Sequence, residues 1–205
     1  SLSASAIETY LACPLKYRMS KIDKIPQTSS KPELVFGNII HKVLQRFHEK
    51  NKDLNEVRAL RLLNEEWQSG MFEYKIREEK FKTQGIEMLT HYVKSIIKSP
   101  PNVIATELNF TFQLNDISIA GTIDRLDKED GIVITDYKTS KSSTKAKTSL
   151  QLAIYSLYLE QTEELVLKGI PKISKLYFLR DFEDPIREHA FSFDELRNTE
   201  QKIIE

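Results

Sequence analysis

Three side chains that lie near one another in the sequence could carry out metal-assisted hydrolysis: Asp124, Asp136 and Lys138. Two buried carboxylates that lie close together repel each other, and one of them would be driven to protonate. A hard divalent cation removes that conflict, because such ions bind carboxylate oxygens. A lysine beside the cation can hold a water molecule or offset developing negative charge. The residues alone also allow a simpler alternative, in which Asp136 and Lys138 form a solvated ion pair at the end of a hairpin.

The chain around these residues has the pattern of two paired strands. Residues 117 to 126 alternate apolar and polar side chains, and residues 132 to 138 are almost wholly apolar until Asp136. An Asp-Gly pair between the two runs indicates a turn. This hairpin would place position 122 opposite Asp136 and Asp124 diagonal to it, with the backbones about 7–8 Å apart. We therefore expect the two carboxylates to be able to close on one metal ion.

Composition limits the class of protein. At 205 residues the chain suits one domain with a full core, and 30 basic against 30 acidic residues leave no overall field that would attract polyanions. Any nucleic-acid site must therefore be a local basic surface. A single cysteine excludes an internal disulfide and suits a reducing compartment, so we expect a cytoplasmic location. No apolar run reaches membrane-spanning length and no signal peptide opens the sequence. The helical pattern at the last residue, Glu205, suggests a domain excised from a larger protein.

Hydrophobic periodicity predicts a mixed α/β protein. Helical patterns dominate residues 1–100 and strands fall in residues 101–205, so we expect one domain, 1–205, with a small central mixed sheet flanked by helices. The predicted order is helices over 3–11, 37–50 and within 54–98, strands over 103–114, 117–126 and 132–138, a helix over 149–161, a strand over 173–180, a charged loop over 181–190, a short strand over 191–193 and a last helix capped by Asp194.

Four further residues are candidates for the same site. His41 lies at the edge of the apolar stripe of its helix, where a histidine is usually a boundary residue. Gln151 and Tyr155 are one turn apart and share a helix face. Glu107 could supply a third carboxylate, although an edge-strand glutamate is the simpler interpretation. The pattern alone decides none of these roles.

Lysines follow the second strand without an opposing acid. Lys141, Lys145 and Lys147 could guide phosphates as a flap, and they are equally typical of a polar loop. The same two interpretations apply to a basic run near the amino terminus, which consists of Lys16, Arg18, Lys21 and Lys24.

Five short motifs follow one another along the chain: LSASAIETYLACPLKY, GNIIHKVL, GTIDRLD, DYKTS and QLAIY. Each is weak alone. In this order and spacing they resemble the signature of the RecB-like branch of the PD-(D/E)XK nuclease superfamily, whose members include AddB-type and CRISPR-associated exonucleases. The resemblance covers nearly the whole chain, and it implies a restriction-endonuclease-like core.

The resemblance implies a role for each matched residue. Lys138 would position the attacking water and offset charge on the phosphate. Gln151 and Tyr155 would brace the site from the following helix, by orienting Lys138 or touching the DNA backbone. The implied cofactor is Mg²⁺ or Mn²⁺, and its ligands would be His41, Asp124, Asp136 and the backbone carbonyl of Tyr137.

The cysteine content sets this chain apart from some of those relatives. AddB-type and CRISPR-associated members use the cysteine of the Cys-Pro motif and three later cysteines to hold a [4Fe–4S] cluster. Cys13 matches the first of them, and the sequence has no other cysteine. Four thiolates are needed, so we predict no iron–sulfur cluster in this chain.

Three hypotheses for the function follow. The first is a divalent-metal-dependent DNA nuclease, specifically an exonuclease of DNA recombination or repair that works with a helicase domain or subunit. The second is a catalytically inactive DNA-binding or scaffold module of the same fold. The third is a structural domain whose hairpin charges pair with each other. Dependence of DNA degradation on Mg²⁺ or Mn²⁺ separates the first two.

Overall fold

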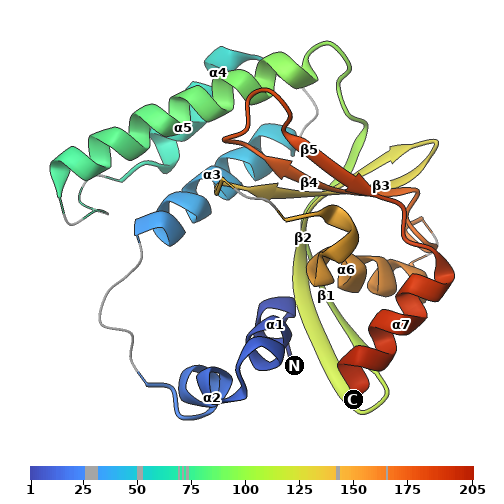
Figure 1. The fold of residues 1–205 in the computed structure, drawn as a ribbon. Coiled ribbons are helices and arrows are strands. Elements are labelled where there is room, and N and C mark those ends of the chain that lie inside the picture. The colour runs from blue at the N-terminus through green and yellow to red at the C-terminus, as the bar shows by residue number, and fades with distance from the viewer. Residues whose placement is uncertain are drawn as a thin grey trace.

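A five-stranded mixed sheet forms the centre of the molecule, as the computed structural model shows (Figure 1). The expected small central sheet flanked by helices is confirmed. Residues 1–25, 32–49, 53–68, 70, 72, 74–141, 144–164 and 166–205 are described.

The strands follow their chain order across the sheet. Neighbours are antiparallel, except that the third and fourth strands are parallel. A parallel pair needs a crossover connection, and a helix that is buried along most of its length provides it here. The strands are β1 (Val103–Leu114), β2 (Ile117–Glu129), β3 (Gly131–Lys138), β4 (Ile173–Phe178) and β5 (Ile186–His189), and the crossover contains the short 3₁₀ turn η2 (Ala146–Thr148) and α6 (Leu150–Gln161).

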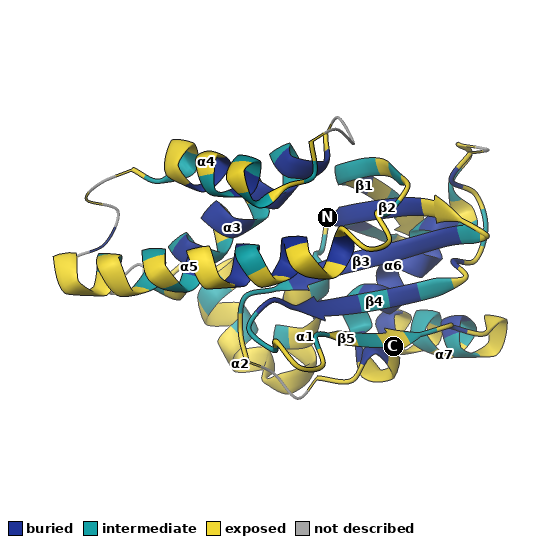
Figure 2. Cartoon of the chain, turned by 90° about the horizontal axis from the view of Figure 1, so that it is seen from above, coloured by how far each residue is buried: buried dark blue, intermediate teal, exposed yellow. Residues whose placement is uncertain are grey.

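Helices cover both faces of this sheet (Figures 1 and 2). One hydrophobic core joins the sheet to three helices of the amino-terminal half, and Tyr137 and Tyr177 of the sheet belong to it. A second core lies on the other face, beneath α6 and the two terminal helices. The first group is α3 (Pro32–His48), α4 (Glu56–Glu66) and α5 (Lys75–Ile96); the terminal helices are α1 (Ala4–Ala12) and α7 (Phe193–Ile204), and α1 leads into α2 (Pro14–Tyr17) and the π-helical turn η1 (Arg18–Ile22).

The sequence pattern of α3 explains its position. Ile40, Val43, Leu44 and Phe47 recur at helical spacing and are all buried, as the pattern predicts. The helix begins before the predicted residue 37. The helical pattern within 54–98 corresponds to two helices, α4 and α5.

The carboxy-terminal part of the chain differs from expectation in two places. The predicted loop over 181–190 contains β5, an edge strand too short for its alternation to stand out. The predicted strand over 191–193 is wrong, because α7 already begins at Phe193. Its cap is Ser192 and not Asp194: Ser192 and Glu195 exchange side-chain and backbone hydrogen bonds as a capping box.

The register of the β2–β3 hairpin also differs from expectation. Arg125 pairs with Thr135, so the same register carried one residue further places Asp124 directly opposite Asp136. The expected pairing of position 122 with Asp136 is therefore wrong by two residues. β2 continues to Glu129, and the turn is tight because Gly131 adopts a φ of 119°, which glycine accepts without strain.

Within the described ranges of the chain, no helix is both long and apolar enough to cross a bilayer.

Candidate active site

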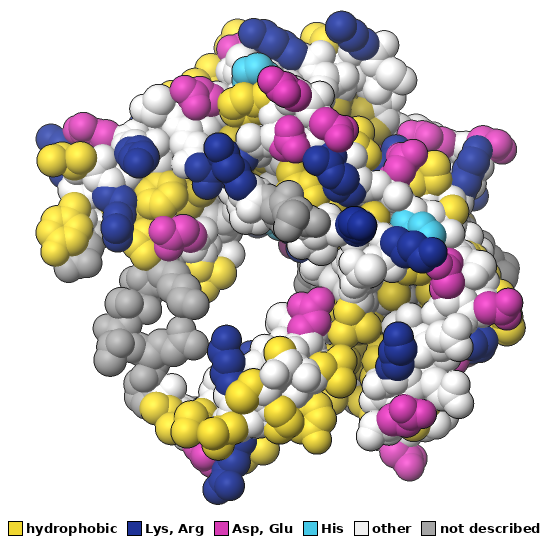
Figure 3. All heavy atoms as spheres, viewed as in Figure 1, with side chains coloured by type: hydrophobic (Ala, Val, Ile, Leu, Met, Phe, Trp, Pro, Cys, Tyr) yellow, Lys and Arg dark blue, Asp and Glu magenta, His cyan; other side chains and the backbone are white. Residues whose placement is uncertain are grey.

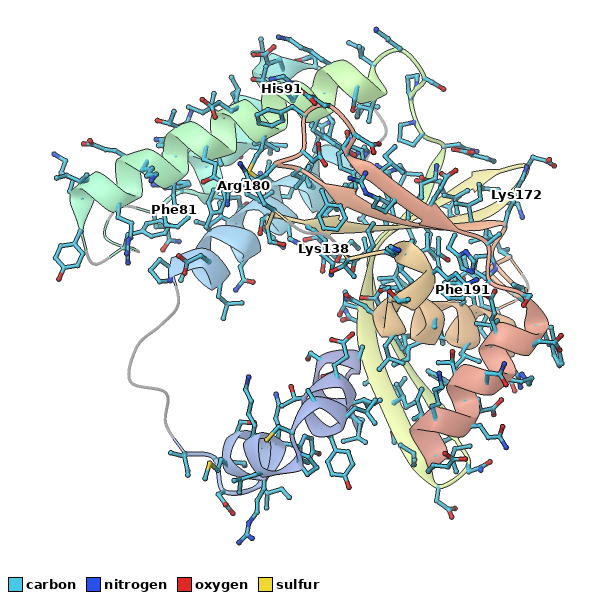
Figure 4. All side chains as sticks on the ribbon, in the orientation of Figure 1. Phe81, His91, Lys138, Lys172, Arg180 and Phe191 are labelled. Carbon is cyan, nitrogen blue, oxygen red and sulfur yellow. The ribbon has the colours of Figure 1, made fainter. Side chains whose placement is uncertain are left out.

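Every residue that the sequence predicts to be catalytic or metal-binding lines a single cavity. It has a volume of about 540 Å³ and opens beside the carboxyl end of β3. In the space-filling view an opening lies between the α1–α2 segment and α3, and Figure 4 labels Lys138 at its border (Figures 3 and 4). The predicted residues that line the cavity are His41, Asp124, Asp136, Tyr137, Lys138, Gln151 and Tyr155.

Asp124 is held from two sides. Its Oδ2 accepts a hydrogen bond from the backbone N–H of Tyr137 at 2.7 Å. Its Oδ1 lies 3.3 Å from Nδ1 of His41. Both contacts come from other elements, β3 and α3, so the carboxylate has a fixed orientation at the cavity wall.

Asp136 is the most deeply buried carboxylate of the cavity, with 1% of its surface exposed. Burial, and then the negative charge of Asp124, raise its pKa to about 6, although Lys138 opposes the shift. The Nζ of Lys138 lies 2.7 Å from Oδ2 of Asp136. The two aspartates face each other across the hairpin, with Lys138 against Asp136 and His41 against Asp124. Two carboxylates this close repel each other.

A chain of polar contacts fixes Lys138 against α6. Its Nζ donates to Oε1 of Gln151 at 2.7 Å, and Nε2 of Gln151 donates to the hydroxyl of Tyr155 at 2.6 Å. Gln151 and Tyr155 share a helix face as their spacing predicts. Burial, and then the charges of Asp136 and Asp124, raise the pKa of Tyr155, which keeps its hydroxyl protonated. The side chain of Ser149 caps this helix, so its first turn is firmly placed beside Lys138.

His41 reaches the carboxylates because α3 passes close to the end of β3. A side chain at Gly37, one turn earlier, would place its Cβ 3.3 Å from Oγ1 of Thr139. Glycine at that position therefore permits the approach. Burial opposes protonation of His41, but the carboxylates of Asp124 and Asp136 outweigh it, and the pKa of His41 is raised.

Glu107 is the residue that the sequence interpretation undervalued. Single ligand atoms of His41, Glu107 and Asp124 lie within 4.8 Å of one another, a spacing that suits one metal ion. Burial, and then the charge of Asp124, raise the pKa of Glu107. Its φ of 47° is unusual for a non-glycine residue, above all within a strand, and such strain is concentrated at functional sites. A glutamate among the apolar residues of β1 was the available signal.

The donors of this cavity fit a hard divalent cation. Carboxylate oxygens and a histidine nitrogen are suitable ligands for Mg²⁺ or Mn²⁺. Oδ2 of Asp136 is buried and has no hydrogen-bond donor with good geometry among the described residues. The compact group formed by His41, Glu107 and Asp124 differs from the implied set, which has Asp136 and the Tyr137 carbonyl in place of Glu107. All of these residues line the same cavity.

The predicted flap lysines have different surroundings. Lys141 lines a second cavity next to the first, Lys145 is exposed, and Lys147 lies 3.8 Å from Glu195 of α7. Residues 142 and 143 lie outside the described residues. In the amino-terminal basic run, Arg18 pairs with Asp23 at 3.3 Å.

The fold and the site together define a class of protein. A mixed sheet presents an aspartate on one central strand and an Asp-x-Lys sequence on the next, beside a histidine from a covering helix. This is the arrangement of the PD-(D/E)XK enzymes. The family model of the PD-(D/E)XK nuclease superfamily matches residues 1–205, and the chain belongs to that superfamily.

Individual relatives are distant. The Gene 69 protein of Mycobacterium phage D29 is 27% identical over 189 residues, which cover 78% of this chain and 69% of that protein. The crystal structure of a "Putative exonuclease" from Eubacterium rectale matches with a TM-score of 0.59 and 14% identity, covering 98% of this chain and 76% of that one. At this identity the structural likeness supports the fold alone.

Proposed function

We propose that this chain is a divalent-metal-dependent deoxyribonuclease that removes nucleotides from DNA ends. The observation that carries the proposal is the convergence of Asp124, Asp136, Lys138 and His41 on one cavity. Superfamily membership supports hydrolysis of phosphodiester bonds. The structural neighbour from Eubacterium rectale is named a "Putative exonuclease", and we propose the same mode of action for this chain.

Four side chains of the cavity would bind the metal ion that hydrolysis requires. When bound, Mg²⁺ or Mn²⁺ supplies Lewis acidity for the scissile phosphate and lowers the pKa of a coordinated water. Asp124, oriented by the N–H of Tyr137, and Asp136 provide carboxylate oxygens for the ion, and Glu107 and His41 complete the donor set.

Lys138 acts on the reacting phosphate. Gln151 and Asp136 hold its ammonium group from two sides, so the charge is positioned before the substrate arrives. A preorganised cation of this kind stabilises the negative charge that develops in the transition state. Tyr155 holds Gln151 in turn.

The cellular role that we propose is DNA recombination or repair, in the RecB-like branch, with a helicase domain or subunit as partner and DNA as substrate. Its support is the order of the five sequence motifs. The proposal is also supported by the cavity lining, to which the helix bearing Gly37 and His41 and the helix bearing Gln151 and Tyr155 both contribute.

Incubation of end-labelled linear and circular single-stranded DNA with Mn²⁺ tests the proposal, with the Asp136→Ala variant as control. The wild-type chain should degrade the linear strand and leave the circle intact, and the variant should degrade neither. Cleavage of the circle would replace exonuclease with endonuclease action. Absence of any cleavage, together with DNA binding that ignores EDTA, would favour an inactive scaffold.

A further inference from the structure

A second cavity lies beside the catalytic one and is not used by the chemistry described so far. It has a volume of about 540 Å³. Ser140 lines the catalytic cavity and Lys141 lines the second one. The backbone N–H of Leu179 donates to the carbonyl of Lys138 at 2.9 Å, which ties the start of this wall to the catalytic lysine. The cavity is lined by Lys80, Thr83, Gln84, Glu87, Lys141, Arg180 and Phe182.

Three cations from separate parts of the chain line this cavity. Lys80 comes from α5, Lys141 follows β3, and Arg180 follows β4. Within the part of the chain that the structure describes, none of the three forms an ion pair with a carboxylate. Figures 3 and 4 share one orientation, and basic side chains are exposed where Figure 4 labels Arg180.

Some basic residues elsewhere in the chain are paired with carboxylates. Lys172 contacts Asp130 at 2.9 Å, and Arg46 contacts both Glu65 and Glu66. In this cavity the one carboxylate is Glu87, against three cations. The cavity therefore carries a positive charge that its own described walls do not neutralise, and anionic groups are its natural occupants.

An aromatic ring stands at the rim of the same cavity. Phe182 stacks on His91 of α5, with ring centroids 4.0 Å apart and the planes within 10° of parallel. The stack fixes the ring, yet 43% of the Phe182 surface is exposed. An exposed and rigid aromatic face beside cations is the combination that single-stranded nucleic acids recognise, since bases stack on the ring while cations bind the phosphates.

We propose that this second cavity is a nucleotide subsite for the single strand whose neighbouring phosphate lies at the catalytic residues. Lys80, Lys141 and Arg180 bind backbone phosphate, and Phe182 stacks on an unpaired base. This inference rests on the proposed nuclease function and adds the path of the strand: from the carboxyl end of β3, past Lys141, toward α5. Duplex DNA keeps its bases paired and cannot use the Phe182 face.

Two substrates separate the subsite from the catalytic site. Binding of a fluorescent single-stranded oligonucleotide is measured by anisotropy with Ca²⁺ in place of Mg²⁺. Hydrolysis of the p-nitrophenyl ester of a mononucleotide is measured with Mn²⁺, since so small a substrate does not reach the second cavity. The Lys80→Ala/Arg180→Ala variant should bind the oligonucleotide more weakly and hydrolyse the small ester at the wild-type rate. Its binding should also depend less on salt, with a slope smaller by about 0.7 for each phosphate that the variant no longer neutralises.

Matched variants test each component. Lys94→Ala removes a lysine from the same helix at a site outside the cavity and should bind like the wild type. Phe182→Ala should weaken single-strand binding roughly tenfold, whereas Phe182→Tyr keeps the ring and should retain it. Glu87→Gln removes the opposing charge and should tighten binding.

Two results would overturn the inference, and they differ from failure of the proposed function. Oligonucleotide binding by the Lys80→Ala/Arg180→Ala and Phe182→Ala variants that equals that of Lys94→Ala would exclude the subsite, although the enzyme still cleaves DNA. An equal reduction in duplex and single-strand binding for Phe182→Ala would exclude base stacking. A wild-type chain that neither binds DNA nor hydrolyses the ester would remove both proposals together.

Discussion

Two polar clusters lie on opposite faces of β2 and β3, and they differ in how their charges are balanced. Asp124 and Arg125 are consecutive, so their side chains leave the strand on opposite faces. We call the first group, His41, Glu107, Asp124 and Asp136, the carboxylate cluster. The second group, His48, Tyr92, Arg125, Asp127, Thr135 and Tyr137, is the arginine cluster.

The arginine cluster contains its own counter-ion. Nε of Arg125 lies 2.9 Å from Oδ1 of Asp127, although these two atoms and Nδ1 of His48 have no hydrogen-bond partner with good geometry among the described residues. Arg125 donates to the hydroxyls of Tyr92 and Tyr137, each at 2.6 Å, and to Oδ2 of Asp127 at 3.0 Å. Both Arg125 and Asp127 are buried. The carboxylate of Asp127 balances the charge of the guanidinium, so this cluster has no need of a ligand.

The carboxylate cluster is unbalanced. Glu107, Asp124 and Asp136 face one lysine and one histidine, and the pKa values of Glu107 and Asp136 are raised, first by burial and then by Asp124. The difference distinguishes a structural cluster from a cation site. In a structural cluster, a side chain of the protein balances each buried charge. In a cation site, the protein supplies an excess of carboxylates and the bound cation balances them.

Two histidines of α3 have pKa values that are shifted in opposite directions. His41 and His48 are about two turns apart on α3. The pKa of His41 is raised, because the carboxylates outweigh the effect of burial. The pKa of His48 is lowered to about 3 by burial and then by the charges of Arg125 and Arg58. The two histidines therefore sense fields of opposite sign.

The largest expected effect comes from breaking the carboxylate cluster. Asp136→Asn should lower DNA hydrolysis by on the order of 10⁴-fold, because metal-assisted catalysis supplies several kcal/mol. The same change removes a buried charge, so without metal the variant should unfold at a temperature equal to or above that of the wild type. Turnover with Mn²⁺ and thermal unfolding in EDTA measure the two effects. Retained activity would exclude Asp136 from the site.

Breaking the arginine cluster should affect stability instead. Arg125→Leu leaves Asp127 buried without its counter-charge, which costs about 3–5 kcal/mol in the free energy of unfolding. Urea unfolding measures it. Arg46→Ala is the matched control, since its partners Glu65 and Glu66 are at the surface and such pairs contribute at most about 1 kcal/mol. Adding Asp127→Leu to Arg125→Leu should restore part of the stability; no restoration would mean that the charge pair is not the cause.

Lys138→Ala should lower the hydrolysis rate by roughly 10²-fold and leave the fold intact. Its side chain is 31% exposed, so removal opens no deep cavity. A steady-state rate with Mn²⁺ and a far-ultraviolet spectrum of the variant measure the two properties. Lys172→Ala, which breaks a remote surface pair, serves as the control. Unchanged turnover in the Lys138→Ala variant would show that Lys138 has no catalytic role.

The carboxylate cluster could be predicted from the sequence better than the arginine cluster, for a physical reason. Asp124, Asp136 and Lys138 lie on two strands joined by a short turn, so local pattern brings them together. Arg125 lies within the GTIDRLD motif, and its partners Asp127, Thr135 and Tyr137 lie on the same hairpin. Its other partners, Tyr92 and His48, come from distant helices whose packing no local pattern specifies.

Local geometry accounts for the remaining errors. The position of the tight turn at Gly131 moved the hairpin register by two residues. Glu107 takes a left-handed backbone conformation inside β1, which strand periodicity does not anticipate. The edge strand β5 is four residues long, too short for alternation to be recognised. The order of helices and strands and the restriction-endonuclease-like sheet followed from periodicity and from the motifs.

The smallest predicted effect is a pH dependence from His48. In the folded protein its pKa is lowered to about 3, whereas an unfolded histidine titrates near pH 6.5. Between these values the unfolded chain binds a proton that the folded chain does not. Stability is therefore fully present above about pH 6.5 and falls as the pH is lowered, by about 1.4 kcal/mol per pH unit, or about 2 kcal/mol by pH 5.

The His48→Gln variant isolates this contribution from those of other titrating groups. Glutamine can still bond to the hydroxyl of Tyr92, which His48 contacts through Nε2 at 2.6 Å, but it does not titrate. Urea unfolding between pH 5 and pH 8 should give a shallower decline of stability in the variant than in the wild type. Equal slopes would mean that His48 takes up its proton in the folded state despite burial and the charges of Arg125 and Arg58. The contrast between the two histidines of α3 would then not hold.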